Sequence, residues 1–187
     1  HAWASSGLAA TYDLVLIGGN PDDPSSIERR MHAQIETIFA EYPEAAAHFH
    51  LLPAMPNTQV RQLEQAVIQA RPALTPHVYV CPSVKEEFGI AVLEAMDAGF
   101  LIIGPQVGGL SSYVAPGKNG FLMDTSDAAT ISGALELILT EHDPGELAAI
   151  AHRGSVSVRS RFDIRTTAAA FAEIYTPLEP PAPSRAP

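Results

Sequence analysis

The chain has 187 residues, of which 47% are hydrophobic and 17% are charged, and its formal net charge is −10. This composition excludes a disordered chain and gives enough residues for a sizeable core, so we expect one main domain. The negative charge argues against a nucleic acid partner but is compatible with a phosphorylated small molecule, because backbone amides at a helix N-terminus can hold an anion.

Apolar runs and turn signals alternate along the first half of the chain. We expect, in order, the end of a helix (1–10), a strand (14–17), a helix (27–42), a strand (48–52) and a helix (58–70). The first strand is continuously apolar, which predicts burial on both faces, as in a parallel sheet. The helix over 27–42 should begin at Ser25 or Ser26 and bury an apolar face made of Ile27, Met31, Ile35, Ile38 and Phe39.

The second half continues the alternation. The expected elements are a strand (78–80), a helix from about 88 to 99, a strand (101–103), a short helix (110–114), a strand (121–123) and helices over 126–139, 143–161 and 163–175. Ser126 and Asp163 are the expected caps of two of these helices. The helix from about 88 to 99 should bury Ile90, Val92, Leu93 and Met96. Residues 176–187 are rich in proline, so we expect a separate extended or disordered tail.

This alternation is typical of an α/β protein with a mostly parallel sheet. Ligands of such sheets bind at the carboxyl ends of the strands. Four segments follow expected strands in this way: Gly18 and Gly19, Pro53, the loop 83–88, and Gly108 and Gly109. We therefore expect them to meet at one edge of the sheet.

Two carboxylates, Glu86 and Glu94, lie at the start of the expected helix and eight positions further on. Eight helical residues span roughly 12 Å and turn about 80° beyond two full turns, so the two side chains should point to similar sides. A ligand with hydroxyl groups at both ends and an anion in the middle would suit them. Taken alone, both could equally be solvated glutamates. Gly18 and Gly19 could likewise mark only a tight strand exit.

Other reactive side chains give weaker signals. His48 and His50 have a spacing that could bind a metal, but no Cys or carboxylate partner is evident, so we expect no metal site. Cys81 falls in a strand and is expected to be a small core residue. Ser83 lacks the surroundings of a nucleophile. No apolar run approaches the ~20 residues of a membrane span and no signal-peptide pattern begins the chain, so we expect a cytoplasmic protein without a transmembrane segment.

The segment PSVKEEFGIAVLEAMDAG at 82–99, followed by GG at 108–109 and NGFL at 119–122, resembles a known signature. It is similar to that of the retaining GT-B glycosyltransferases of group 1 (family 4), over about residues 12–140. The resemblance implies that residues 1–175 form a Rossmann-like, nucleotide-sugar-binding domain, the C-terminal half of a GT-B fold that lacks its first strand.

The resemblance also implies roles for single residues. Glu86 would contact hydroxyls of the donor sugar, and Glu94 would hold the ribose hydroxyls of the nucleotide. The amides of Phe88, Gly89 and Ile90 would meet the diphosphate or the sugar. The candidate donor loops carry Gly18, Gly19, Gly108 and Gly109. A nucleoside-diphosphate sugar is then the donor substrate. No metal is expected, because no D-x-D pattern occurs, and the resemblance implies no other cofactor.

The chain departs from the family pattern in several places. Glu87 puts a negative charge where Pro or Gly is usual, LIIG at 101–104 replaces PVVA, and the connection from Leu52 to Val78 is longer. From the family pattern, we expect the first strand with its Arg and Lys, and the N-terminal domain that carries the acceptor site, to be missing from this chain. We therefore expect no catalytic residue and no activity from this chain alone. Alternatives are a non-catalytic nucleotide-sugar-binding module, and a disaccharide synthase or phosphorylase of the same fold.

Overall fold

The computed structural model describes residues 1–20, 22–70 and 76–175. The proline-rich segment expected at 176–187 and most of the connection before Val78 lie outside these residues. None of the described helices is both long and apolar enough to span a bilayer.

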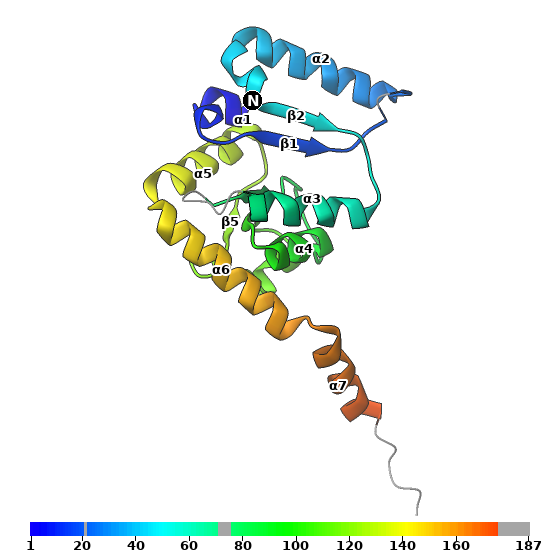
Figure 1. The fold of residues 1–187 in the computed structure, drawn as a ribbon. Coiled ribbons are helices and arrows are strands. Elements are labelled where there is room, and N and C mark those ends of the chain that lie inside the picture. The colour runs from blue at the N-terminus through cyan, green and yellow to red at the C-terminus, as the bar shows by residue number, and fades with distance from the viewer. Residues whose placement is uncertain (21, 71–75, 176–187) are drawn as a thin grey trace, which may run out of the picture.

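Helices and strands alternate along the described chain (Figure 1). In order, the elements are α1 (Ala2–Ser5), η1 (Leu8–Ala10), β1 (Leu14–Ile17), α2 (Ser26–Glu41), η2 (Pro43–His48), β2 (Phe49–Leu52), α3 (Asn57–Ala70), β3 (Val78–Val80), α4 (Ile90–Ala98), β4 (Leu101–Pro105), η3 (Gly109–Ser112), β5 (Phe121–Met123), α5 (Ala128–Glu141), α6 (Pro144–Arg161) and α7 (Ile164–Tyr175).

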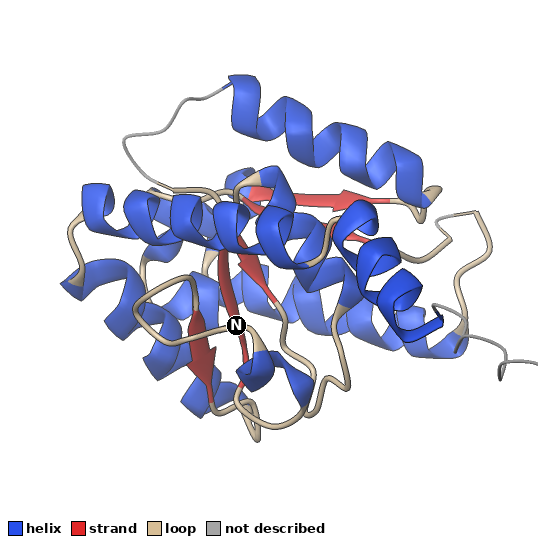
Figure 2. Ribbon diagram, turned by 90° about the horizontal axis from the view of Figure 1, so that it is seen from below, coloured by secondary structure: helices blue, strands red, loops and turns tan. Residues whose placement is uncertain are grey.

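All paired strands are parallel, which confirms the predicted fold class. They form two sheets instead of one: β1 pairs with β2, and β4 lies between β3 and β5. In the first sheet Leu14 pairs with Phe49, and in the second Val78 pairs with Leu101. Helices surround both sheets, as Figure 2 shows with the strands in red.

The core lies on the two faces of β4, every residue of which is buried. Leu101 and Ile103 belong to a cluster with residues of β5, α5 and the first half of α6. Ile102 belongs to a second cluster with residues of α4 and η3. This alternation follows from the two-residue period of a strand. Both faces of the central strand are covered, which explains why it consists of apolar residues.

The prediction that β1 is buried on both faces was wrong. Val15, Leu16 and Ile17 are 44%, 37% and 38% exposed, because within the described residues β1 pairs only with β2. The apolar face expected on α2 is also only partly covered. Ile27 and Met31 are exposed, while the last turns pack through Ile38, Phe39 and Tyr42 against a small cluster of alanines, Ala4, Ala9 and Ala45.

The N-terminal segment joins the two sheets. Trp3 contacts both the cluster that contains Leu101 and Ile103 and the small alanine cluster beside α2. Its indole N–H donates to the Tyr12 carbonyl at 2.8 Å. Leu8 is buried in the first of these clusters. The segment thus fixes the first sheet against α5, which α1 also contacts.

The helix caps largely follow the expected pattern. Ser25 caps α2 and forms a capping box with Glu28, as predicted. Helix α5 is capped by Asp127 and not by Ser126, since the Asp127 carboxylate accepts the amides of Ala129 and Thr130. Helix α7 projects away from the rest of the molecule (Figure 1), and its described side chains are all exposed.

Candidate functional site

The loop between β3 and α4 is fixed against the segment that follows β4. Glu86 forms an isolated parallel bridge with Gly108: its amide donates to the Val107 carbonyl at 3.3 Å, and its carbonyl accepts the Gly109 amide at 2.8 Å. A Cβ on Gly108 or Gly109 would overlap the backbone carbonyl oxygen of Glu86 or Glu87. The two glycines therefore permit a close backbone approach that holds this loop (residues 83–89). We call it the donor loop, after the role that the resemblance implies for Glu86 and Phe88.

The charge that departs from the family pattern points outward. The Glu87 side chain is 79% exposed and pairs with Lys85, with 2.6 Å between Nζ and Oε1. An exposed ion pair of this kind contributes little to stability. Glu87 therefore adds no uncompensated charge to the inner side of the donor loop.

Helix α4 begins at Ile90, two residues later than predicted. Gly89 precedes it in the left-handed region (φ 77°, ψ 59°), and no side chain caps the helix. The first amides of a helix have no intrahelical partner, and they carry the positive end of the helix dipole. The donor loop thus ends at a site of local positive potential in a chain whose overall charge is negative.

The buried side of α4 differs from the prediction at one position. Val92, Leu93 and Met96 are buried, but Ile90 is 66% exposed. Its place at the first residue of the helix leaves it at the mouth, outside the stripe that faces β4.

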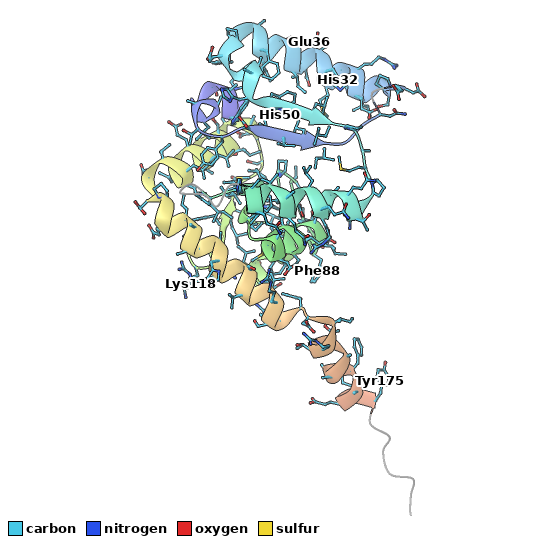
Figure 3. All side chains as sticks on the ribbon, in the orientation of Figure 1. His32, Glu36, His50, Phe88, Lys118 and Tyr175 are labelled. Atoms are coloured by element: carbon cyan, nitrogen blue, oxygen red, sulfur yellow. The ribbon has the colours of Figure 1, made fainter. Side chains whose placement is uncertain are left out.

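The aromatic residue of the donor loop is anchored from two sides. The Phe88 ring lies 6.1 Å from the rings of both Tyr113 and Phe162, which themselves lie 5.8 Å apart, all in edge-to-face arrangements. Figure 3 places Phe88 beside α4 and the end of α6. The Tyr113 hydroxyl also donates to the Phe88 carbonyl at 2.6 Å. Sequence reasoning missed both partners, because neither is near the loop in sequence.

Glu94 lies one turn into α4 and is half-buried. The Asn57 side-chain amide, at the first residue of α3, donates to both of its carboxylate oxygens at 3.1 and 3.4 Å. A carboxylate accepts about four hydrogen bonds, so this contact leaves acceptor capacity for a ligand. Asn57 follows β2 at its carboxyl end, the one signal that could have marked it in the sequence.

The two predicted carboxylates both affect the pKa of one tyrosine. Burial raises the pKa of Tyr79, and the charges of Glu64, Glu86 and Glu94 raise it further, together with Cys81. All of these groups are therefore near enough to Tyr79, in the middle of β3, to act on it electrostatically. That Glu86 and Glu94 face one region stays a prediction.

An ion-pair network lies further along α4, around Asp97. Asp97 contacts Arg61 of α3 at 3.0 Å and Arg159 of α6 at 2.9 Å. Burial acts to raise the pKa of Asp97, but the hydrogen bonds and charges of Arg159 and Arg61 together lower it. The network links the three helices that surround Glu94.

Glu64, on the same side of α3, has a buried Oε2 atom without a hydrogen-bond partner among the described residues. Burial raises its pKa, the nearby Arg61 lowers it, and Glu94 raises it again. No chemical role follows from this placement, but the carboxylate charge is costly there.

Two cavities border the predicted residues. One, of about 330 Å³, opens between α3, α4 and α6 and is lined by residues that include Glu94, Asp97 and Phe162. It falls within the size range of small-molecule sites. The other, of about 80 Å³, is lined by Gly18, Gly19 and residues of α2, and is too small for a nucleotide. Among the described residues, the backbone hydrogen bonds of Gly18 and Gly19 join Leu52 and Ala54 and not the donor loop.

His48 directly precedes β2, a strand of the first sheet, and His50 lies within that strand. His48 Nδ1 is 2.9 Å from one Asp13 carboxylate oxygen, and His50 Nε2 is 3.8 Å from the other. The sequence did not reveal this carboxylate partner. Nevertheless, the described residues contain no group of three His, Cys, Asp or Glu side chains arranged to hold a metal ion.

The chain matches the family "Glycosyl transferases group 1" over residues 12–153. It is 29% identical over 169 residues to the D-inositol 3-phosphate glycosyltransferase of Acidothermus cellulolyticus, covering 90% of this chain and 34% of that protein. It is 29% identical over 135 residues to the alpha-maltose-1-phosphate synthase of Mycolicibacterium smegmatis, covering 71% of this chain and 31% of that one. The chain thus spans about a third of the length of these relatives.

Solved structures agree with this match. The sucrose-phosphate synthase of Thermosynechococcus elongatus aligns with a TM-score of 0.66 and 25% identity, over 94% of this chain and 41% of that one. Anabaena HepE in complex with UDP aligns with a TM-score of 0.66 and 20% identity, over 94% and 44%. The fold is that of one half of a GT-B enzyme, and the chain belongs to the group 1 glycosyltransferase family.

Proposed function

We propose that residues 1–175 form the donor-binding domain of a retaining glycosyltransferase, which moves a sugar from a nucleoside-diphosphate sugar to an acceptor hydroxyl. One observation carries the proposal: the donor loop is held against Gly108 and Gly109 so that Glu86 lies at the mouth of α4, with Glu94 one turn inside the helix. HepE was solved with UDP and with UDP-glucose, which supports this class of donor.

The two carboxylates have unequal roles in this proposal. Glu94, held by Asn57, accepts hydrogen bonds from the ribose hydroxyls. Glu86 accepts from hydroxyls of the transferred sugar. Between them, the amides of Phe88, Gly89 and Ile90 meet the diphosphate, because the uncapped N-terminus of α4 favours an anion.

Catalysis would then require electrostatic stabilisation of the leaving diphosphate, with the acceptor hydroxyl attacking from the same face of the sugar. Amides that are fixed in advance stabilise developing charge without reorganisation. No protein nucleophile is needed for this step. We propose that the acceptor site comes from an N-terminal domain and that the basic groups for the diphosphate come from the loop after the first strand of the donor-binding domain, so that this chain alone does not turn over a donor. The relatives are two to three times longer than the matched segment, which supports a second domain.

A pair of substitutions tests the division of roles. Glu94→Gln should weaken binding of a nucleoside diphosphate and of its sugar conjugate alike, because both contain the ribose. Glu86→Gln should weaken only the sugar-bearing form. Calorimetric titration with UDP, ADP and GDP and with their glucose conjugates measures both effects. Equal losses at the two positions would contradict the assignment, and the absence of binding to a folded, unaltered chain would overturn the proposed function.

A further inference from the structure

The Phe88 carbonyl has an unusual partner for a loop group. It accepts the hydroxyl of Tyr113 at 2.6 Å, and the same oxygen of Tyr113 lies 3.4 Å from the Gly89 carbonyl. Tyr113 comes from the end of η3, 25 residues further along the chain, and is only 4% exposed. Burial, together with the charges of Glu86 and Cys81, raises its pKa to about 12. The hydroxyl is therefore a protonated donor at any physiological pH.

This hydrogen bond fixes the orientation of a peptide group. The peptide between Phe88 and Gly89 is trans and planar, so its C=O and N–H point in opposite directions. Because the carbonyl faces the buried Tyr113 hydroxyl, the Gly89 amide faces away from it. This amide makes no hydrogen bond within the described residues.

The surroundings leave the peptide group little freedom to turn. The rings of Phe88, Tyr113 and Phe162 pack edge to face on one side. On the other, a Cβ at Gly89 would lie 2.9 Å from the Tyr113 hydroxyl oxygen and 3.0 Å from Leu110 Cδ1. Contacts this short show that the hydroxyl and the glycine backbone are closely packed.

We propose that Tyr113 is a positioning residue that aims the Gly89 amide at the diphosphate of the donor. The proposal rests on the proposed function and adds a residue outside the motif to it. Tyr113 does not touch the ligand itself. Its hydroxyl sets the direction of one amide at the mouth of α4, and hence the part of the ligand that this amide can reach.

The expected effect depends on the part of the ligand that is present. Tyr113→Phe keeps the ring and its packing but removes the donor, so the Phe88–Gly89 peptide loses the hydrogen bond that sets its orientation. Hydrogen bonds to charged groups are worth more than neutral ones, so we expect about a tenfold loss of affinity for a nucleoside diphosphate and for its glucose conjugate. The nucleoside alone should bind within about twofold of the unaltered chain, because it has no phosphate for the amide to meet.

The test is a calorimetric and NMR titration of the unaltered chain and of Tyr113→Phe with uridine, UDP and UDP-glucose, and with the adenine and guanine equivalents. Tyr12→Phe is the matched control, since Tyr12 packs beside a different part of the core. In ¹⁵N spectra of the ligand-free chains, the Gly89 amide signal should move in Tyr113→Phe and stay in place in Tyr12→Phe. A purely structural role would lower the urea midpoint without selecting between ligands.

The outcomes separate the two claims. Selective loss for the phosphate-bearing ligands supports the inference. Unchanged affinity in Tyr113→Phe, or an equal loss for all three ligands, overturns it, while Glu94→Gln would still report on the proposed function. If the unaltered chain binds no nucleoside diphosphate or sugar conjugate, the proposed function fails and the inference fails with it.

Discussion

Replacement of Gly109 by alanine tests how the donor loop is held. The added methyl would overlap the Glu87 carbonyl oxygen and would lie 2.9 Å from the Glu87 carbonyl carbon. Carbon atoms pack best at about 3.5–4 Å, so the donor loop must move away by more than half an ångström. Both obstacles are backbone atoms, which cannot turn aside as a flexible side chain could.

The cost follows from two changes. Overpacking of this kind costs about 1–3 kcal/mol. Movement of the loop also weakens the bond from the Gly109 amide to the Glu86 carbonyl, which is worth about 1 kcal/mol. We therefore expect the free energy of unfolding to fall by about 2–3 kcal/mol, within the range of ordinary destabilising mutations. The affinity for a nucleoside-diphosphate sugar should fall as well, because Glu86 and the mouth of α4 no longer keep their relative positions.

Urea unfolding and calorimetric titration measure these effects. Gly133→Ala is the control, since a methyl there meets nothing within 4 Å and the position is inside α5. Alanine in place of glycine inside a helix should stabilise the chain by about 0.5–1 kcal/mol and leave binding unchanged. A Gly109→Ala chain with unaltered stability and affinity would refute the close approach as the support of the donor loop.

Substitutions at three further positions address the helices around Glu94. Asn57→Asp places a second carboxylate beside Glu94, so nucleoside affinity at pH 7 should fall further than in Asn57→Ala; calorimetry showing equal losses would contradict this. The native pKa of Asp97 is lowered, so its stabilisation is present above the unfolded pKa of about 3.9 and is lost as the pH falls through the native pKa. Urea midpoints of Asp97→Asn should therefore depend less on pH in that acidic range, and a parallel pH profile would argue against the network. The native pKa of Glu64 is raised, so its charge destabilises the fold as the pH rises; Glu64→Gln should raise Tm at pH 7 but not at pH 4, where a persistent gain would exclude this electrostatic origin.

Local sequence signals predicted the elements well. The strands and helices fall near the expected residues, and α2 and α6 begin at Ser26 and Pro144, directly after the capping residues Ser25 and Asp143. The pattern failed where burial depends on neighbours. An apolar run shows that β1 can be buried, but its exposure is set by which strands pair with it, and pairing is not a local property.

The candidate site remains a prediction from the motif. The motif marks Glu86, Glu94 and the glycines as candidate site residues, and the structure shows that Gly108 and Gly109 approach the backbone of the donor loop closely. Tyr113 and Asn57, which hydrogen-bond to the donor loop and to Glu94, could not be predicted from the motif. Tyr113 reaches the loop from 25 positions away and Asn57 reaches Glu94 from 37, and no periodicity encodes such contacts.

The central claim is that the donor loop and the first turns of α4 bind a nucleoside-diphosphate sugar. The most direct measurement is a ¹⁵N NMR titration of the chain with UDP-, ADP- and GDP-glucose, with assigned backbone amides. One of these donors should shift the amides of Gly89 and Ile90 most strongly, with smaller changes near Glu94 and Gly108. Saturating shifts confined to Gly18 and Gly19, or no shifts with any of the three donors, would contradict the account.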